Sequence, residues 1–525
     1  ASDTQKIRSN HECKDKLVTQ RRTTFDHRSF NGHFEVISRN KFWLSAFLVI
    51  AVALLGFIQI TKPKTWTLEK YYAQNLDWKD CYNGFECATF KVPVDYEKIT
   101  DQSFNLKVLR HRATDTKNRV GALLVNPGGP GGSATDYAFN AESIVSAKIY
   151  KRYDIVGFDP RGINNSQPIR CLTNSEEDEF LDADATGGSS GEIAKLIEIS
   201  KSFASKCAEA AGVKLGHYST LEAAKDMDIL RSILGMSKLN YLGKSYGTYL
   251  GTLYAALFPK KVGKFVLDGA VAPNASLRDQ ELAQAIGFDS ALRNYLVKNK
   301  KISLNQILDF IHKSEDKPLI TKSQRALSQS LIITALAQSL YDVKTGWPEL
   351  TEALHSAIVK DNPIKLLQLA DEYNNRDSAG NFYTNQGDIS IMITCLDWQE
   401  NRSIAQMASD QEEFKKSSPV FGPYLGFAGL PCKYWKAKPQ LPNISLTKIN
   451  TSPLLIIGVT GDPATPYKWA EELVKSFSKA TLVTLKGEGH TGHNRGNKCV
   501  DAAVDSYFLT GKIPQTPLIC AESGN

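Results

Sequence analysis

Gly243-Lys244-Ser245-Tyr246-Gly247 marks a sharp turn from a strand into a helix. The apolar run 239–242 precedes it, and the helix-like segment 248–258 follows it. A serine at such a junction stands clear of the backbone, because the flanking glycines let the turn close tightly. Its hydroxyl is then free to attack a carbonyl carbon. A pattern this short also arises by chance, so its meaning depends on the rest of the chain.

Strand-like runs recur on both sides of this turn, and several are continuously apolar, as in parallel sheets covered on both faces. Helix-like segments such as 221–234 and 469–477 lie between them. This alternation predicts an α/β fold with a mostly parallel, eight-stranded sheet. The expected strands are Cys87–Val94, Phe104–Arg112, Gly121–Asn126, Tyr153–Asp159, Leu239–Gly243, Lys264–Asp268, Pro453–Val459 and Thr481–Lys486.

The segment 272–450 breaks the alternation, because it is long, mostly helical in pattern and contains no clear βαβ unit. We interpret it as a helical cap inserted between the sixth and seventh strands. The α/β core then has two parts, 80–271 and 451–525. Loops at the carboxyl ends of parallel strands surround the site in such folds, so a cap there would control substrate access.

The N-terminal region contains an apolar run, 42–60, interrupted only by Ser45, Gly56 and Gln59. As a helix it would span about 28 Å, enough to cross the hydrocarbon core of a bilayer. A cleaved signal peptide is the alternative, but the polar stretch that precedes the run is longer than a usual n-region. We therefore expect a transmembrane signal anchor, with a cytosolic tail at 1–41, a stem at 61–79 and the catalytic part lumenal or extracellular. Secretion after cleavage is the other possibility.

The cysteines agree with an oxidising compartment, since Cys13 alone precedes the apolar run and an even number follows it. Their spacing favours local pairs, although spacing alone does not determine connectivity. No Cys-x-x-Cys occurs, which argues against a zinc site or a redox dithiol. The expected disulfides are Cys81–Cys87, Cys171–Cys207, Cys395–Cys432 and Cys499–Cys520. Glycosylation sequons also all follow the run, at Asn164, Asn274, Asn401, Asn443 and Asn450.

The composition excludes one class of partner. The 525 residues carry a formal net charge of only +7, and the basic residues form no block with interleaved aromatics. Nucleic-acid binding is therefore not expected.

A serine nucleophile needs a base, and the base needs an orienting acid. Asp462 follows the apolar run 454–459, where the seventh strand should end, and His490 follows the eighth strand. The chain order Ser245, Asp462, His490 is the order of nucleophile, acid and base in α/β-hydrolase folds. Two rivals remain: His493 as the base, and Asp268, at the end of the sixth strand, as the acid.

The stretch 126–133, with the sequence NPGGPGGS, follows the third predicted strand. Its glycines let backbone N–H groups approach a substrate oxygen without an intervening side chain. We expect an oxyanion hole formed by the amides of Gly129 (or Gly128) and Tyr246. The loop lacks the Gly-Lys-Ser/Thr ending of a phosphate-binding loop, which argues against that alternative.

With these motifs the chain resembles the tripeptidyl-aminopeptidase-like α/β hydrolases, which are relatives of the prolyl aminopeptidases. The resemblance runs from about Trp78 to Cys520. It departs from the usual pattern at 162–166, where relatives have a second glycine, and in the N-terminal tail and anchor. The matching motifs are NPGGPGGS at 126–133, DIVGFDPRG at 154–162, GKSYGTYLG at 243–251, VLDG at 266–269, GDPATP at 461–466 and GEGH at 487–490.

The resemblance implies serine hydrolysis without metal or organic cofactor, usually with release of short peptides from a free N-terminus. An aminopeptidase must also bind an α-ammonium, for which a cap carboxylate is the natural partner. Asp397 and Glu400 are candidates, and ordinary solvated or capping acids are the alternative.

We therefore expect a membrane-tethered serine aminopeptidase that acts on peptides. The alternatives are a carboxylesterase or amidase that uses the same triad on small acyl substrates, and a non-catalytic binding or adhesion module. The last is disfavoured, because such modules typically lose the nucleophile or the base, and this chain has both.

Overall fold

The computed structural model describes residues 66–439 and 444–522. The expected tail at 1–41, the membrane anchor at 42–60 and the start of the stem lie outside these ranges. Within them, no helix combines the length and the apolar character needed to cross a membrane.

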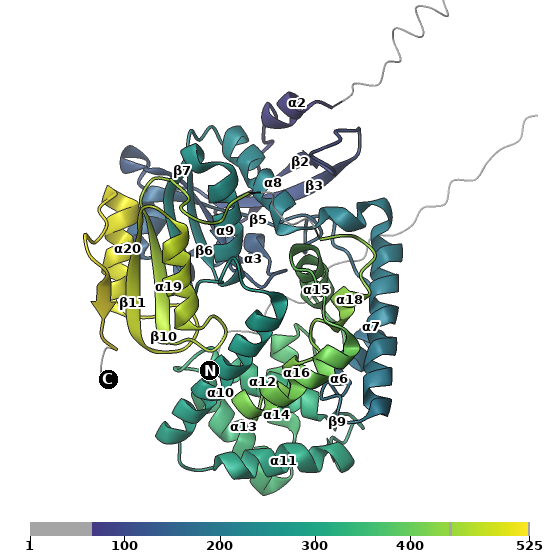
Figure 1. Ribbon diagram of the computed structural model, residues 1–525. Coiled ribbons are helices and arrows are strands. Elements are labelled where there is room, and N and C mark those ends of the chain that lie inside the picture. Colours follow the sequence, from purple (N-terminus) through teal and green to yellow (C-terminus); the bar gives the residue numbers. More distant parts are fainter. Residues whose placement is uncertain (1–65, 440–443, 523–525) are drawn as a thin grey trace, which may run out of the picture. The chain divides into compact units, whose positions relative to one another are not determined.

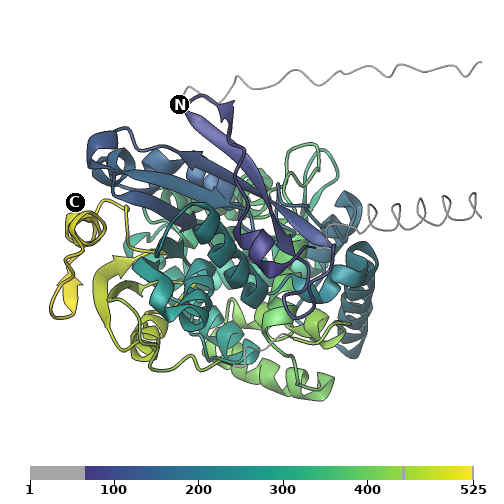
Figure 2. The same ribbon diagram turned by 90° about the horizontal axis from the view of Figure 1, so that it is seen from above.

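A ten-stranded sheet lies at the centre of the described unit (Figure 1). Pairing is antiparallel from β1 to β5 along the sheet and parallel from β5 to β12, which is the arrangement of an α/β-hydrolase fold. Figure 2 shows the purple and blue strands at one end of the sheet and the yellow C-terminal elements at the other. In spatial order the strands are β1 (Lys79–Tyr82), β2 (Phe85–Pro93), β3 (Ser103–His111), β5 (Tyr153–Phe158), β4 (Gly121–Asn126), β6 (Leu239–Lys244), β7 (Val262–Asp268), β10 (Leu454–Gly461), β11 (Ala480–Glu488) and β12 (Leu518–Cys520).

The expected count of eight strands is wrong by two, because β1 and β12 at the two edges were not recognised. Every residue of β1 is exposed, and β12 is only three residues long, so neither shows the apolar pattern of an inner strand. Disulfides secure both edges instead: Cys81–Cys87 joins β1 to β2, and Cys499–Cys520 joins α20 to β12.

Helices cover both faces of the sheet, because alternate strand residues point to opposite sides. In β7, Phe265 and Leu267 belong to the apolar core beneath α8 and α9, whereas Val266 belongs to the core beneath α5 and α20. The helices outside the β7–β10 connection are α2 (Leu68–Tyr72), α3 (Ala134–Phe139), α4 (Ala141–Ile144), α5 (Ala147–Arg152), α6 (Asn174–Asp182), α7 (Ser190–Ala211), α8 (Thr220–Ile233), α9 (Tyr246–Leu257), α19 (Tyr467–Ser476) and α20 (Lys498–Thr510).

The connection from β7 to β10 is the helical insertion, drawn in green below the sheet in Figure 1. It has an apolar core of its own, which includes Ile307, Leu336 and Leu354. Helices α6 and α7, from the β5–β6 connection, pack against it. The insertion contains a short hairpin, β8 (Leu319–Ile320) and β9 (Ala326–Leu327), and the helices α10 (Leu277–Lys298), α11 (Leu304–Asp316), α12 (Gln329–Leu340), α13 (Gly346–Lys360), α14 (Ile364–Tyr373), α15 (Gln386–Asp397), α16 (Ile404–Ser417), α17 (Gly422–Leu425) and α18 (Leu430–Lys433).

All four expected disulfides are present in the structure. Two of them lie outside the sheet: Cys171–Cys207 ties the loop before α6 to α7, and Cys395–Cys432 ties α15 to α18. Cys13 lies outside the described residues.

Candidate active site

Ser245 occupies the turn between β6 and α9 with φ 54° and ψ −127°. A positive φ is strained for a residue that has a side chain, so packing around the turn must hold it. The two glycines allow that packing, because a Cβ on Gly243 would lie only 2.5 Å from the carbonyl oxygen of Gly247. The serine is thereby presented at the carboxyl end of the strand.

Asp462 and His490 meet at the carboxyl ends of the neighbouring strands β10 and β11. The imidazole Nδ1 lies 2.9 Å and 3.0 Å from the two carboxylate oxygens of Asp462. Asp462 is 4% exposed and also accepts hydrogen bonds from the amides of Ala464, Thr465 and Thr491. These donors stabilise the ionised carboxylate and orient it. On the other side of the ring, Nε2 of His490 is buried and has no hydrogen-bond partner among the described residues.

The serine and the histidine approach each other through the segment that follows β7. The amide of Ser245 donates to the carbonyl oxygen of Asp268 at 2.9 Å. A Cβ on the next residue, Gly269, would lie 3.2 Å from Cε1 of His490. No hydrogen bond joins Ser245 Oγ to His490 Nε2 in the described part of the chain, and such contacts are often loose before substrate binds.

Asp268, the rival acid, takes a different place. It is fully buried, and its carboxylate accepts the amides of Gly492 at 2.7 Å and His493 at 3.0 Å. Lys244 Nζ lies 3.7 Å from the same carboxylate and donates to the carbonyl oxygen of His493. Asp268 thus connects the serine turn to the histidine loop, and the geometry favours Asp462 as the partner of the imidazole.

His493, the rival base, has both ring nitrogens buried without a hydrogen-bond partner among the described residues. Burial, together with the nearby charge of Lys244, lowers its pKa to about 3. The imidazole is therefore neutral, but no carboxylate orients it. The geometry favours His490 as the base.

The glycine loop after β4 lies directly against the serine turn. A Cβ on Gly128 would come within 2.9 Å of Ser245 Cβ and 3.0 Å of the Tyr246 nitrogen. The Gly128 amide is engaged by the side chain of Asn126 at 3.0 Å, whereas no acceptor in the described residues faces the amide of Gly129. Tyr246 begins α9, so its amide has no partner within the helix. The geometry therefore favours Gly129 over Gly128 as a donor beside Tyr246.

Sequence reasoning missed the contact between α15 and this loop. A Cβ on Gly131 would lie 2.9 Å from Ile389 and 3.2 Å from the carbonyl oxygen of Gln386. Asn385, just before α15, donates to the carbonyl oxygens of Gly162 and Ile169, in the loop that follows β5. A lone asparagine before a helix carries no sequence signal of such a role.

Asp397, the first candidate for binding a substrate amine, is buried and already hydrogen-bonded. It is 4% exposed, and its carboxyl group binds the amide and the hydroxyl of Thr220. Burial raises its pKa to about 7.

Glu400 belongs to a charged group of the insertion that the sequence did not reveal. Arg402 binds Glu400 at 2.6 Å and Glu281, from α10, at 2.8 Å. Burial raises the pKa of Glu281 to about 8, and the charge of Arg402 opposes that rise. One turn further along α10, Gln284 donates to the carbonyl oxygen of Ala464, within the loop that carries Asp462. This places Glu281 on a helix that contacts the loop of Asp462, with Glu400 joined to it through Arg402.

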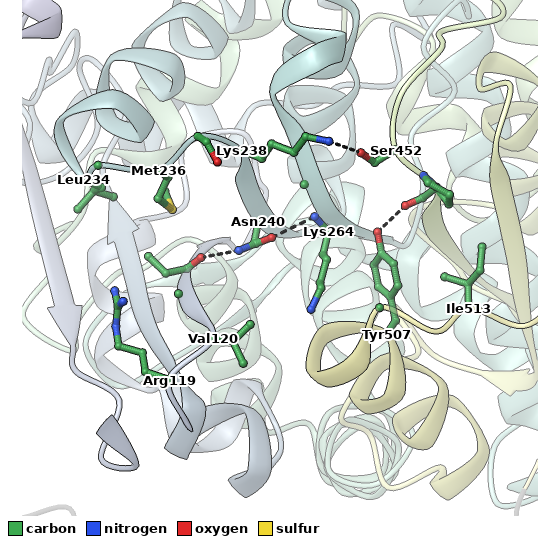
Figure 3. A pocket seen from close by; sticks show the side chains of 17 residues that line it. Arg119, Val120, Leu234, Met236, Lys238, Asn240, Lys264, Ser452, Tyr507 and Ile513 are labelled. Carbon is green, nitrogen blue, oxygen red and sulfur yellow. Dashed lines mark hydrogen bonds between the residues drawn. The ribbon is translucent and has the colours of Figure 1, made fainter. Parts of the chain in front are cut away.

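Two of the hollows in the described residues lie at opposite ends of the parallel strands. The one in Figure 3, of about 610 Å³, is lined by the amino ends of the strands, including Val120, Asn240 and Lys264, and so lies away from the triad. The other, of about 790 Å³, is lined by Glu488, Thr491 and Arg495 and lies beside the histidine loop.

One cluster of three acidic side chains in the described residues has the spacing of metal ligands: Asp184, Glu192 and Glu315. It lies outside the triad, and nothing else there points to an ion.

The sequons differ in how well they suit a glycan. Asn274, Asn401 and Asn450 are exposed. At Asn164 the sequon hydroxyl belongs to Ser166, which is fully buried and accepts the amide of Lys107. Asn443 lies outside the described residues.

Comparison with known proteins gives a consistent picture. Residues 418–520 match the family described as TAP-like protein. Serine protease Hip1 of Mycobacterium tuberculosis is 32% identical over 508 residues, which cover 91% of this chain and 96% of Hip1. Tripeptidyl aminopeptidase of Streptomyces lividans is 31% identical over 474 residues, 85% of this chain and 86% of the relative. Carboxylesterase B of Mycobacterium tuberculosis is 34% identical over 452 residues, 83% and 86% of the two chains.

Proposed function

This chain belongs to the tripeptidyl-aminopeptidase-like family of α/β hydrolases, and from that membership we propose that it is a serine aminopeptidase with the triad Ser245, Asp462 and His490. The observation that carries the proposal is the Asp462–His490 pair, in which Nδ1 is bound to the carboxylate and Nε2 has no hydrogen-bond partner among the described residues. The relatives named as a serine protease and as a tripeptidyl aminopeptidase support the peptide as substrate.

The chemistry follows from the geometry. His490 takes the proton of Ser245 as the hydroxyl attacks the scissile carbonyl carbon, and Asp462 holds the imidazole and stabilises its cation. The amides of Gly129 and Tyr246 stabilise the negative oxygen of the tetrahedral intermediate. His490 then gives its proton to the leaving amine, and water hydrolyses the acyl-enzyme to release the N-terminal fragment. No step requires a metal or an organic cofactor.

Preference for a free N-terminus would come from the acidic pair Glu281 and Glu400. Arg402 binds Glu281 and Glu400 and lies 3.4 Å from Asp410, and burial raises the pKa of Glu281 to about 8, so an incoming ammonium would favour the ionised form of Glu281. Glu400 is retained as an amine-binding candidate, and Glu281, which shares Arg402 with it, is proposed beside it.

A carboxylesterase with the same triad is the second candidate, favoured by the similarity to carboxylesterase B. The test is a peptide-library digest with free and with N-acetylated peptides, run beside short acyl esters. An aminopeptidase releases short N-terminal fragments only from the free peptides, whereas ester cleavage without peptide cleavage favours the second candidate. Ser245→Ala and His490→Ala should each lower the rate on the order of 10³-fold or more with the fold retained.

We also propose that the chain is a single-pass membrane protein, anchored by residues 42–60 with its catalytic part outside the cytosol. Four disulfides in the described part support an oxidising compartment. Protease protection of full-length protein in microsomes, with and without detergent, tests this topology, and release of the whole chain by carbonate would contradict it.

A further inference from the structure

The backbone has a positive φ on both sides of the proposed base, and at Thr491 this conformation is strained. Gly489 has φ +96°, and Thr491 has φ +66° although it carries a β-branched side chain. Such a conformation persists only where surrounding contacts hold it. Three of those contacts come from the core: Asp462 accepts the amide of Thr491, and Asp268 accepts the amides of Gly492 and His493.

The remaining contact comes from the helical insertion. Tyr341 follows α12, and its carbonyl oxygen accepts the amide of His490 at 2.9 Å. The tyrosine ring lies edge-to-face with the imidazole, with centroids 5.1 Å apart and planes at 88°. The ring of Phe288, from α10, packs on the Tyr341 ring with centroids 5.7 Å apart, so the apolar core of the insertion supports Tyr341.

An ion pair between Arg495 and Asp342 stabilises the contact between Tyr341 and His490. One Arg495 nitrogen binds the carboxylate of Asp342 at 2.8 Å and lies 3.4 Å from the Tyr341 carbonyl oxygen. Another donates to the carbonyl oxygen of His490 at 3.3 Å. Lys344, two residues beyond Asp342, donates to the carbonyl oxygen of Arg495. In the described residues, the turn 341–344 and the loop 489–495 are thus joined by four hydrogen bonds and by the contact between the two rings.

We propose that Tyr341 is a positioning residue for His490, and that the Asp342–Arg495 pair makes the placement of the base depend on docking of the insertion. The inference rests on the proposed function, since it takes His490 as the base. Asp462 orients the imidazole from the core, whereas Tyr341 holds its main chain and covers its ring from the insertion. A displacement of about 1 Å at such a residue is enough to lower a rate on the order of 10²-fold.

The experiment uses the full chain and a fluorophosphonate probe, because labelling of Ser245 requires the base but no particular substrate. Tyr341→Ala and Arg495→Met should each slow labelling about 10- to 100-fold. Tyr341→Phe keeps the ring and should slow labelling less than about 3-fold. The double variant Asp342→Asn/Arg495→Met should label no more slowly than Arg495→Met alone, since the two residues act as one unit.

The matched control is Arg325→Met, which breaks the ion pair of Arg325 with Asp371 in the same insertion. It should label at the wild-type rate. With an ester substrate, the Tyr341 and Arg495 variants should lower kcat and leave KM nearly unchanged, as expected for loss of base placement rather than of a substrate contact.

The outcomes separate the two proposals. Absence of labelling at Ser245 in the wild type, with Ser245→Ala as the blank, refutes the hydrolase and this inference with it. If the wild type is labelled and the Arg495→Met and Asp342→Asn variants are labelled at the same rate, the inference fails while the proposed function stands. An increase in KM with unchanged kcat also overturns the inference. If Tyr341→Ala does not fold, the Arg495→Met and Asp342→Asn variants decide, since both side chains are partly exposed.

Discussion

At the scale of single residues, Asp268 shows how one buried carboxylate organises several backbone segments. Its main-chain oxygen holds the amide of Ser245, and its side chain holds the amides of Gly492 and His493. A buried charge is stable when it is paired and hydrogen-bonded, and here Lys244 supplies the opposite charge. Asp268 therefore relates the nucleophile to the base without contacting either reacting atom.

Replacement of Asp268 by asparagine should reduce both activity and stability. The amide nitrogen of asparagine would face one of the two N–H donors, which would leave that donor without an acceptor, and the Lys244 ammonium would lose its opposite charge while keeping the carbonyl oxygen of His493. We expect a loss of about 1–3 kcal/mol in the free energy of unfolding and a labelling rate lowered about 10-fold or more. Urea unfolding and fluorophosphonate labelling measure the two effects.

Asp505→Asn is the control for this variant, because Asp505 also accepts a hydrogen bond, from Ser146, but lies on α20 away from the histidine loop. If the Asp268→Asn variant is labelled at the wild-type rate, contacts other than those of Asp268 hold the serine turn and the histidine loop in place.

At the scale of elements, two acidic residues, Glu177 of α6 and Asp388 of α15, lie where these two helices contact each other. Glu177 faces the start of α15, where a Cβ on Gly387 would lie 2.6 Å from its carboxylate. Burial, and secondly the charge of Asp388, raise the pKa of Glu177 to about 7. One oxygen of each carboxylate is buried without a hydrogen-bond partner among the described residues. The contact matters because α15 also packs on the glycine loop at Gly131.

The pH dependence of stability follows from this shift. Since the pKa of Glu177 is higher in the folded state than in the unfolded chain, the folded state binds more protons between about pH 4.5 and 7. Its contribution to stability is complete below about pH 4.5 and is lost as the pH rises through about 7. Glu177→Gln should therefore gain stability relative to wild type between about pH 5 and 8.

Urea unfolding of wild type and Glu177→Gln at several pH values in that range tests the prediction. Glu179→Gln, on the exposed side of α6, is the control and should follow the wild-type profile. Parallel profiles of wild type and Glu177→Gln would mean that the pKa of Glu177 in the folded protein is close to its unfolded value.

At the scale of the whole molecule, the disulfides of the described residues close loops of very different lengths. Cys81–Cys87 spans 6 residues at the sheet edge, whereas Cys395–Cys432 spans 37 residues within the insertion. In the chain-entropy account, the longer loop gives the larger stabilisation. Cys395 is also 1% exposed, so its replacement disturbs packing as well.

Paired replacement by serine should separate the two bridges. We expect the Cys395→Ser/Cys432→Ser variant to lose about 3–4 kcal/mol in the free energy of unfolding, and the Cys81→Ser/Cys87→Ser variant about 2 kcal/mol. Chemical denaturation of both variants beside the wild type measures the difference. Equal losses would indicate that strain or residual structure in the unfolded chain outweighs loop length.

From the sequence alone, eight of the ten strands of the central sheet in the described residues, and their order, could be predicted. Strands β4, β5 and β10 show the apolar runs that packing between two helical layers requires, whereas β2 and β3 alternate between buried and more exposed residues. The motifs placed Asp462 and His490 at the ends of their strands, and the local spacing of the cysteines agreed with the observed pairs. These features depend on near neighbours in the chain, which a single sequence displays.

The tertiary structure alone decided the contacts between distant segments. Asp268 receives amides from residues more than 200 positions away, and Tyr341 meets His490 across the boundary between insertion and core. Glu281 and Glu400 come together through Arg402 only because α10 lies close to the segment that follows α15. The hydrophobic periodicity of the sequence does not predict these long-range contacts. They result from how the helical insertion packs on the sheet and from which buried polar groups then form hydrogen bonds.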